Sequence, residues 1–210
     1  MFFRKLLGAK GLKVVKKGVW GEHPIFVTVL GICSSLAVSN KVENAIAMGA
    51  GVTFVLIATA IMISTLRNIM PQRVRMITYM IAIASFVIIV DKFLQAFYPV
   101  ISESVGPYVG LIITNCILMG RAEAFYIQNG VYHSVLDAIS NGIGYSYTLI
   151  VIAVVREVLG FGTVLGISVM PGGWEKWVIM SMAPGAFFLV GVAIWISREL
   201  TGAKSEDKGA

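Results

Sequence analysis

Residues 44–66 read NAIAMGAGVTFVLIATAIMISTL, a run of 23 residues without any Asp, Glu, Lys or Arg. As a helix, a run of this length spans about 34 Å, which exceeds the roughly 30 Å hydrocarbon core of a bilayer. The run therefore predicts a transmembrane helix. The whole chain supports this class of protein, because only 13% of its 210 residues are charged, about half the usual share in soluble domains.

Five further runs also lack charged side chains, and together they predict an all-α integral membrane protein with six transmembrane helices. The last run is long enough to span the bilayer by itself. The third reaches full length only if it continues towards Tyr98, and the fifth can extend to Asp137 and Arg156 at its two ends. The six runs are 24–40, 44–66, 76–90, 104–120, 138–155 and 177–197.

The first and fourth runs are short and interrupted. They read PIFVTVLGICSSLAVSN (24–40) and SVGPYVGLIITNCILMG (104–120), and their length is at the lower limit of about 17 residues for a span. Glycine and proline weaken a helix. The backbone groups freed in this way must find partners inside the protein, so both broken segments are expected to lie inside the bundle.

The same order of features occurs twice along the chain. Each set of three spans begins with a broken segment that carries a cysteine, and each continues with a span that ends in an arginine, Arg67 or Arg156. Because three is an odd number of crossings, the second set must be inverted. We therefore predict two inverted three-helix repeats, residues 23–98 and 99–198, with functional sites near the midplane on the broken helices.

The distribution of basic residues predicts that both termini are cytoplasmic. Residues 1–22 contain six Lys or Arg, and the connection between the second and third spans adds three arginines. The connections after the first and third spans carry one lysine each, so the positive-inside rule sets the orientation. The segment 1–22 fits either an interfacial helix or a basic tail, and residues 199–210 form a polar tail. Positive charge at the ends of apolar runs, rather than in one patch, argues against nucleic-acid binding.

The two cysteines of the chain, Cys33 and Cys116, each lie in a broken run. The helical rise places them about 14 and 18 Å into these runs, near the bilayer centre. A membrane-embedded cysteine is often just a small apolar residue, and a disulfide would require close approach of the two segments. Thiolates also bind soft metals and iron–sulfur clusters, but two are half of a four-ligand set. A cluster here would need a second chain with its own pair of cysteines.

Several stretches resemble one family of membrane proteins, which comprises the paired D and E subunits of the sodium-pumping NADH:quinone reductase and the A and E subunits of the related Rnf ferredoxin:NAD complex. The amino-acid sequence of these stretches is closest to the D type, and Ser34 stands where Rnf E subunits tend to have proline. The stretches are LGICSSLAV (30–38), FVIIVDKFLQAF (86–97), GLIITNCILMGRAEAF (110–125), NGIGY (141–145), REVLGFGTVLG (156–166) and APGAFFLVGVAIW (183–195).

The resemblance implies a [2Fe–2S] cluster held by Cys33 and Cys116 together with two cysteines of a homologous, inverted E subunit. It implies electron transfer from an NADH-oxidising subunit on the cytoplasmic side towards a covalent flavin on the outer side. The whole complex is expected to lie in the bacterial inner membrane, to contain the A, B, C and F subunits as well, to reduce ubiquinone and to export Na⁺. FAD, FMN and riboflavin are expected in other subunits, and no catalytic residue is expected in this chain alone.

Other polar residues carry weaker expectations. Ser34, Thr114 and Asn115 flank the thiols and either donate hydrogen bonds to sulfur or satisfy the broken backbone. Arg121 and Glu123 are expected to form an interfacial ion pair; the alternatives are that they cap the broken helix or position a partner. Arg67 and Arg156 are expected to anchor the ends of spans, and close helix packing is expected at Asn141, Gly142 and Gly144.

Two other functions fit parts of this pattern. A secondary transporter also uses inverted repeats and broken helices, but it would normally carry ionisable groups on those helices. The broken segments here offer thiol, hydroxyl and amide groups instead. A structural membrane subunit with inert thiols is the third alternative.

Overall fold

The computed structural model describes residue 25 and residues 30–68, 70–97, 99–164, 167–168 and 182–201. Within these ranges the chain is helical apart from one small antiparallel hairpin. The elements are α3 (Ile32–Val38), α4 (Val42–Leu66), the 3₁₀ turn η2 (Gln72–Val74), α5 (Arg75–Phe97), α6 (Pro99–Ile113), α7 (Cys116–Arg121), the π-helical turn η3 (Ala122–Tyr126), α8 (Val131–Phe161), β1 (Thr163–Val164), β2 (Ile167–Ser168) and α10 (Ala183–Thr201).

Four segments of the described chain are long and apolar enough to cross a membrane, and they coincide with the second to fifth predicted spans. The sixth predicted span corresponds to α10, whose apolar part is shorter than 18 residues. Of the first predicted span, only residue 25 and residues 30–40 are described, so the six-span count stays a prediction. The four segments are Val42–Leu66, Gln72–Phe97, Gly106–Tyr126 and Val131–Phe161.

The predicted tails lie almost entirely outside the described residues. Residues 1–22 fall outside them completely, and at the other end the description stops at Thr201. α10 includes residues 199–201, so its helix continues past the boundary predicted at residue 198.

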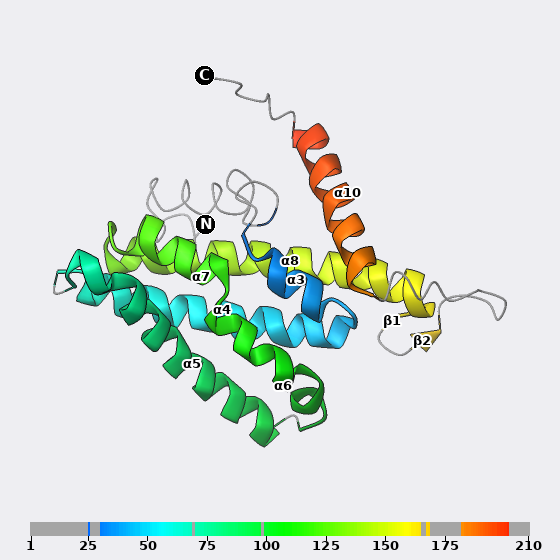
Figure 1. Cartoon of the computed structure of the whole chain (residues 1–210), viewed down its shortest axis with the longest axis horizontal. Helices are drawn as coiled ribbons and strands as arrows, with labels where there is room; N and C mark the ends of the chain where they lie inside the picture. The colour runs from blue at the N-terminus through cyan, green and yellow to red at the C-terminus, as the bar shows by residue number, and fades with distance from the viewer. Residues whose placement is uncertain are drawn as a thin grey trace, which may run out of the picture.

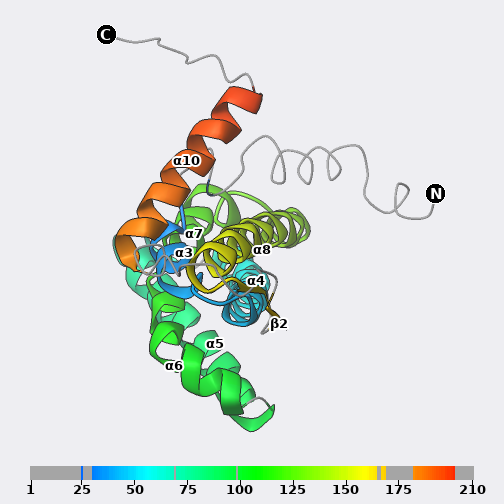
Figure 2. The same ribbon diagram turned by 90° about the vertical axis from the view of Figure 1, so that its right-hand side faces the viewer.

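Helices α4 and α8 form the central pair of the molecule; they run side by side along its long axis in Figure 1 and are seen nearly end-on in Figure 2. Gly49 of α4 lies against Ser146 of α8, and Thr53 of α4 lies against Gly142 of α8, so the two helices are antiparallel. A Cβ atom on Gly142 would lie 2.7 Å from Cγ2 of Thr53. The close packing predicted at Gly142 is therefore confirmed, and it follows the small-residue pattern of membrane helix pairs.

Helices α5 and α6 diverge from this pair, and α10 leaves the bundle at an angle (Figures 1 and 2). Large apolar side chains on α5 and α10 are exposed in the single chain. Such a surface suits lipid or neighbouring subunits rather than water, which agrees with the predicted membrane class. The most exposed examples include Ile77, Ile81, Ile88, Phe93, Phe187, Phe188 and Trp195.

Candidate functional site

The fourth predicted span is broken immediately before Cys116. Helix α6 ends at Ile113, and α7 begins at Cys116 after an extended Asn115. The side-chain Oδ1 of Asn115 accepts a hydrogen bond from the backbone N–H of Ile117 at 3.3 Å. Asn115 is therefore the N-cap of the second half of the span, and such a cap satisfies an amide that the break leaves free.

The helix that carries Cys33 begins after a special backbone conformation as well. Gly31 stands before the first residue of α3 in a left-handed conformation, with φ of +83°, which residues other than glycine adopt at a cost. Cys33 is the second residue of α3, and Cys116 is the first residue of α7. The two thiols thus occupy corresponding places, each at the start of a short helix.

The structure brings these two helix starts into contact. The backbone N–H of Gly31 donates a hydrogen bond to Sγ of Cys116 at 2.8 Å. Cys33 follows Gly31 by two residues, so both cysteines belong to one region of the molecule. The sequence pattern predicted a functional site on the two broken segments, but the glycine amide as the donor to sulfur was not predicted.

A buried polar network holds the two helix starts together. Oγ of Ser34 donates to the carbonyl oxygen of Gly31 at 3.0 Å and accepts from Nδ2 of Asn115 at 3.2 Å. The hydroxyl of Tyr145 lies 2.6 Å from the same Ser34 oxygen. Because a serine hydroxyl has one proton and two lone pairs, the Tyr145 hydroxyl is the donor in that contact. Of the two roles expected for Ser34 and Asn115, the structure shows the one that satisfies the broken backbone.

Tyr145 was not predicted as part of the site. It is fully buried on α8, and its ring would lie 3.0 Å from a Cβ atom on Gly31. The residue type offered one clue, since a buried tyrosine needs a partner for its hydroxyl. Nothing in the spacing indicated that this partner would be Ser34, which is 111 residues away.

The two thiols differ in exposure. Cys33 is exposed on the surface of the single chain and Cys116 is half-buried; both are free. Thr114, beside the break, is exposed as well. Within the described ranges, no group of three or more His, Cys, Asp or Glu side chains is placed to hold a metal ion. The exposed Cys33 is open to contact from a second chain.

A second polar group clamps the turn between α3 and α4. The guanidinium of Arg156, on α8, donates to Oγ of Ser39 at 2.6 Å and to the carbonyl oxygen of Leu36 at 3.2 Å. The neighbouring carboxylate of Glu157 accepts from the backbone N–H of Val42 at 2.8 Å. Arg156 was predicted to anchor a span end, but it is buried and ties down the end of α3 instead.

The prediction of an ion pair between Arg121 and Glu123 is wrong. Arg121 is buried and pairs with the carboxylate of Asp137 on α8. Glu123 lies 3.6 Å from Arg75 and accepts a hydrogen bond from the hydroxyl of Tyr79 at 3.0 Å. The π-helical turn η3 begins directly after Arg121. Ordinary α-helical spacing therefore does not predict which partners Arg121 and Glu123 reach.

Comparison with known proteins identifies one family that covers most of this chain. The family model of the Rnf-Nqr subunit, described as a membrane protein, matches residues 11–194. The chain belongs to the Rnf-Nqr family of membrane proteins.

Three relatives illustrate the similarity within the Rnf-Nqr family, and each is named as the D subunit of a Na⁺-translocating NADH-quinone reductase. The protein of Chlamydia felis is 41% identical over 90% of this chain and 93% of its own length. That of Psychromonas ingrahamii is 44% identical over 93% and 95%. That of Pseudoalteromonas atlantica is 43% identical over 93% and 98%. The resemblance drawn from the sequence motifs to this family, and to its D-type members, is confirmed.

Proposed function

We propose that this chain is an electron-transfer membrane subunit of a Na⁺-translocating NADH:ubiquinone reductase, and that Cys33 and Cys116 hold one half of a [2Fe–2S] cluster. The observation that carries the proposal is the hydrogen bond from the Gly31 amide to the Cys116 sulfur. The names of the D-type relatives support the choice of complex. In that setting the chain is part of an oxidoreductase and is not catalytic by itself.

The residues present fit such a group. The donors are thiols, which are the usual ligands of iron–sulfur clusters. The Gly31 amide stabilises negative charge on the Cys116 sulfur, as hydrogen bonds to cluster sulfurs commonly do. Cys33 is exposed, so a second protein can bring its own ligands close to it. A bound [2Fe–2S] cluster would supply one-electron transfer near the middle of the membrane.

The remaining ligands have to come from a partner, because the chain has two cysteines in all. The proposed partner is the homologous E subunit, inverted in the membrane, which contributes two more cysteines. The A, B, C and F subunits complete the complex, with FAD, FMN and riboflavin bound outside this chain. In this proposal the chain crosses the bacterial inner membrane six times as two inverted repeats, both termini are cytoplasmic, and electron transfer is coupled to Na⁺ export.

Iron analysis of the purified complex tests the proposal. We expect Cys33→Ala and Cys116→Ala each to abolish the electron paramagnetic resonance signal of this cluster and quinone-reductase turnover while all subunits still co-purify. Ser85→Ala is the control, since it removes a side-chain atom of similar kind at an exposed position of α5, outside both segments that carry the cysteines. Normal iron content and turnover in either cysteine variant would refute the proposal. Co-purification with Rnf subunits would identify the Rnf E-type alternative instead.

A further inference from the structure

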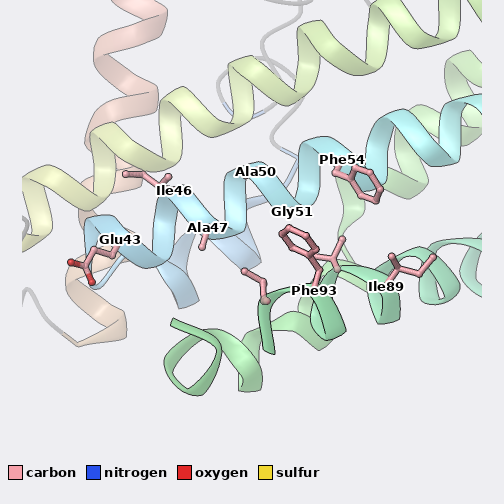
Figure 3. Close-up of a pocket in the computed structure, with 10 residues that line it drawn as sticks. Glu43, Ile46, Ala47, Ala50, Gly51, Phe54, Ile89 and Phe93 are labelled. Carbon is pink, nitrogen blue, oxygen red and sulfur yellow. The ribbon is translucent and has the colours of Figure 1, made fainter. Parts of the chain in front are cut away.

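An apolar crevice separates helices α4 and α5 and has a volume of about 630 Å³. Figure 3 shows Glu43, Ile46, Ala47, Ala50, Gly51 and Phe54 following one another along α4, with Ile89 and Phe93 of α5 facing them. The small side chains of Ala47, Ala50 and Gly51 leave the space open. Ile89 and Phe93 are exposed in the single chain, so the crevice opens to the surroundings of the bundle.

The length and the lining of the crevice favour a hydrocarbon chain. Glu43 and Phe54 are about 16 Å apart along α4 at 1.5 Å per residue. Apart from Glu43, the described residues that line the crevice are apolar. The exposed Ile89 and Phe93 leave it open to the surroundings of the bundle, so a flexible acyl chain can enter it from the bilayer.

One end of the crevice is charged. Among the described residues that line it, Glu43 is the only one with a charge, and its side chain is exposed beside the start of α4. A carboxylate accepts hydrogen bonds and attracts a cation. It gives no favourable contact to a quinone ring, whose carbonyl oxygens are also acceptors. It complements a primary ammonium group, which donates hydrogen bonds and carries a positive charge.

We propose that this crevice is a phospholipid site. One acyl chain lies between α4 and α5 against Ala47, Ala50 and Phe93, and the primary-amine headgroup, as in phosphatidylethanolamine, donates to Glu43. Burial of apolar area holds the chain, and the ammonium–carboxylate contact selects the headgroup. Neither cysteine is among the described residues that line the crevice, so the site stands whether or not a cluster is bound.

Photo-crosslinking tests this site. The complete complex is placed in vesicles of phosphatidylethanolamine and phosphatidylglycerol that contain a trace of phosphatidylethanolamine with a diazirine on one acyl chain. We expect labelling of residues 46–54 and 89–94 to exceed labelling at the exposed reference residues Ile61 and Ile77. Ala50→Phe fills the crevice and should reduce this labelling about tenfold, because it displaces several methylene groups. Ala96→Phe, at an exposed position of α5 outside the crevice, should leave it unchanged.

The headgroup is tested with Glu43→Gln. The wild-type chain should label more strongly with the phosphatidylethanolamine probe than with the matching phosphatidylcholine probe, and Glu43→Gln should reduce that preference about threefold. A preference that survives Glu43→Gln would overturn the headgroup assignment. Crevice labelling no higher than at the reference residues, labelling untouched by Ala50→Phe, displacement by a quinone, or crosslinks from the crevice to another protein of the complex would overturn the site.

Discussion

The backbone amide of Gly31 donates a hydrogen bond to the sulfur of Cys116 at 2.8 Å, although 85 residues separate them. This contact joins the start of α3 to the start of α7. It depends on a left-handed glycine, because the amide is turned towards the sulfur at the start of α3, where φ is +83°. The local conformation of one residue therefore sets the geometry around one of the two thiols.

Gly31→Ala should destabilise the protein. The left-handed conformation alone costs an alanine about 1 to 2 kcal/mol, and the new Cβ atom would also lie 3.0 Å from the Tyr145 ring. We expect a larger loss in the free energy of unfolding, measured for the full chain in detergent, than for Gly162→Ala. Gly162 is also left-handed, with φ of +71°. Equal losses in the two variants would show that the Tyr145 ring moves away without cost.

Tyr145→Phe should remove the hydrogen bond to Ser34 while keeping the ring. Loss of one such bond typically costs about 1 kcal/mol, and the buried Ser34 oxygen loses one of its partners. The matched control is Tyr147→Phe, two residues further along α8, where the side chain is 65% exposed. Denaturation of both variants of the full chain measures the difference. A Tyr145→Phe variant as stable as Tyr147→Phe would contradict the network described for the site.

The sequence predicted the features that depend on local composition. The apolar run 44–66 forms α4, which begins two residues earlier than predicted. An uncharged run of this length has few alternatives to a transmembrane helix. An interruption of the fourth span was predicted from Gly106, Pro107 and Gly110, but all three lie inside α6, which ends only at Ile113. The prediction was therefore right about the segment and wrong about the position of the break. Similar reasoning placed Cys33 on a broken segment.

The sequence did not predict contacts that depend on how distant helices rotate against one another. The partner of Arg121 is Asp137, which lies 16 residues away, and not Glu123, two residues away. Neighbours two apart on a helix point in different directions, so that pair was a poor candidate in physical terms. The burial of Arg156 at the end of α3 depends on the packing of α8, which no spacing rule specifies.

Arg156→Met should loosen α3. The variant keeps an apolar stem of similar length but leaves the Ser39 hydroxyl and the Leu36 carbonyl without their donor, at a cost on the order of 3 kcal/mol. We expect faster hydrogen exchange at the backbone amides of Ile32–Val38, measured by mass spectrometry on the full chain. Arg67→Met, at the exposed end of α4, should leave this exchange unchanged. Unaltered protection of the α3 amides in Arg156→Met would show that the hydrogen bonds from Arg156 do not stabilise this helix.

Gly142→Ala should separate the central helix pair. The added methyl group would lie 2.7 Å from Cγ2 and 2.8 Å from Oγ1 of Thr53, and overpacking of this kind costs about 1 to 3 kcal/mol. The gain in helix propensity, up to about 1 kcal/mol, offsets only part of it. Gly191→Ala, where the new methyl group meets no neighbouring element of the described chain within 4 Å, should show the gain alone.

A second substitution distinguishes steric overlap from a general effect of the alanine. Thr53→Ala removes the two atoms nearest to the Gly142→Ala methyl group and leaves only Cβ of residue 53, at 3.1 Å. It gives up the hydrogen bonds of the Thr53 hydroxyl to the Gly49 carbonyl and to Ser146. Such bonds contribute only about 0.6 kcal/mol on average in membrane proteins. The double variant should therefore recover most of the unfolding free energy lost in Gly142→Ala. If it is no more stable than the single variant, the contact between Gly142 and Thr53 does not set the distance between α4 and α8.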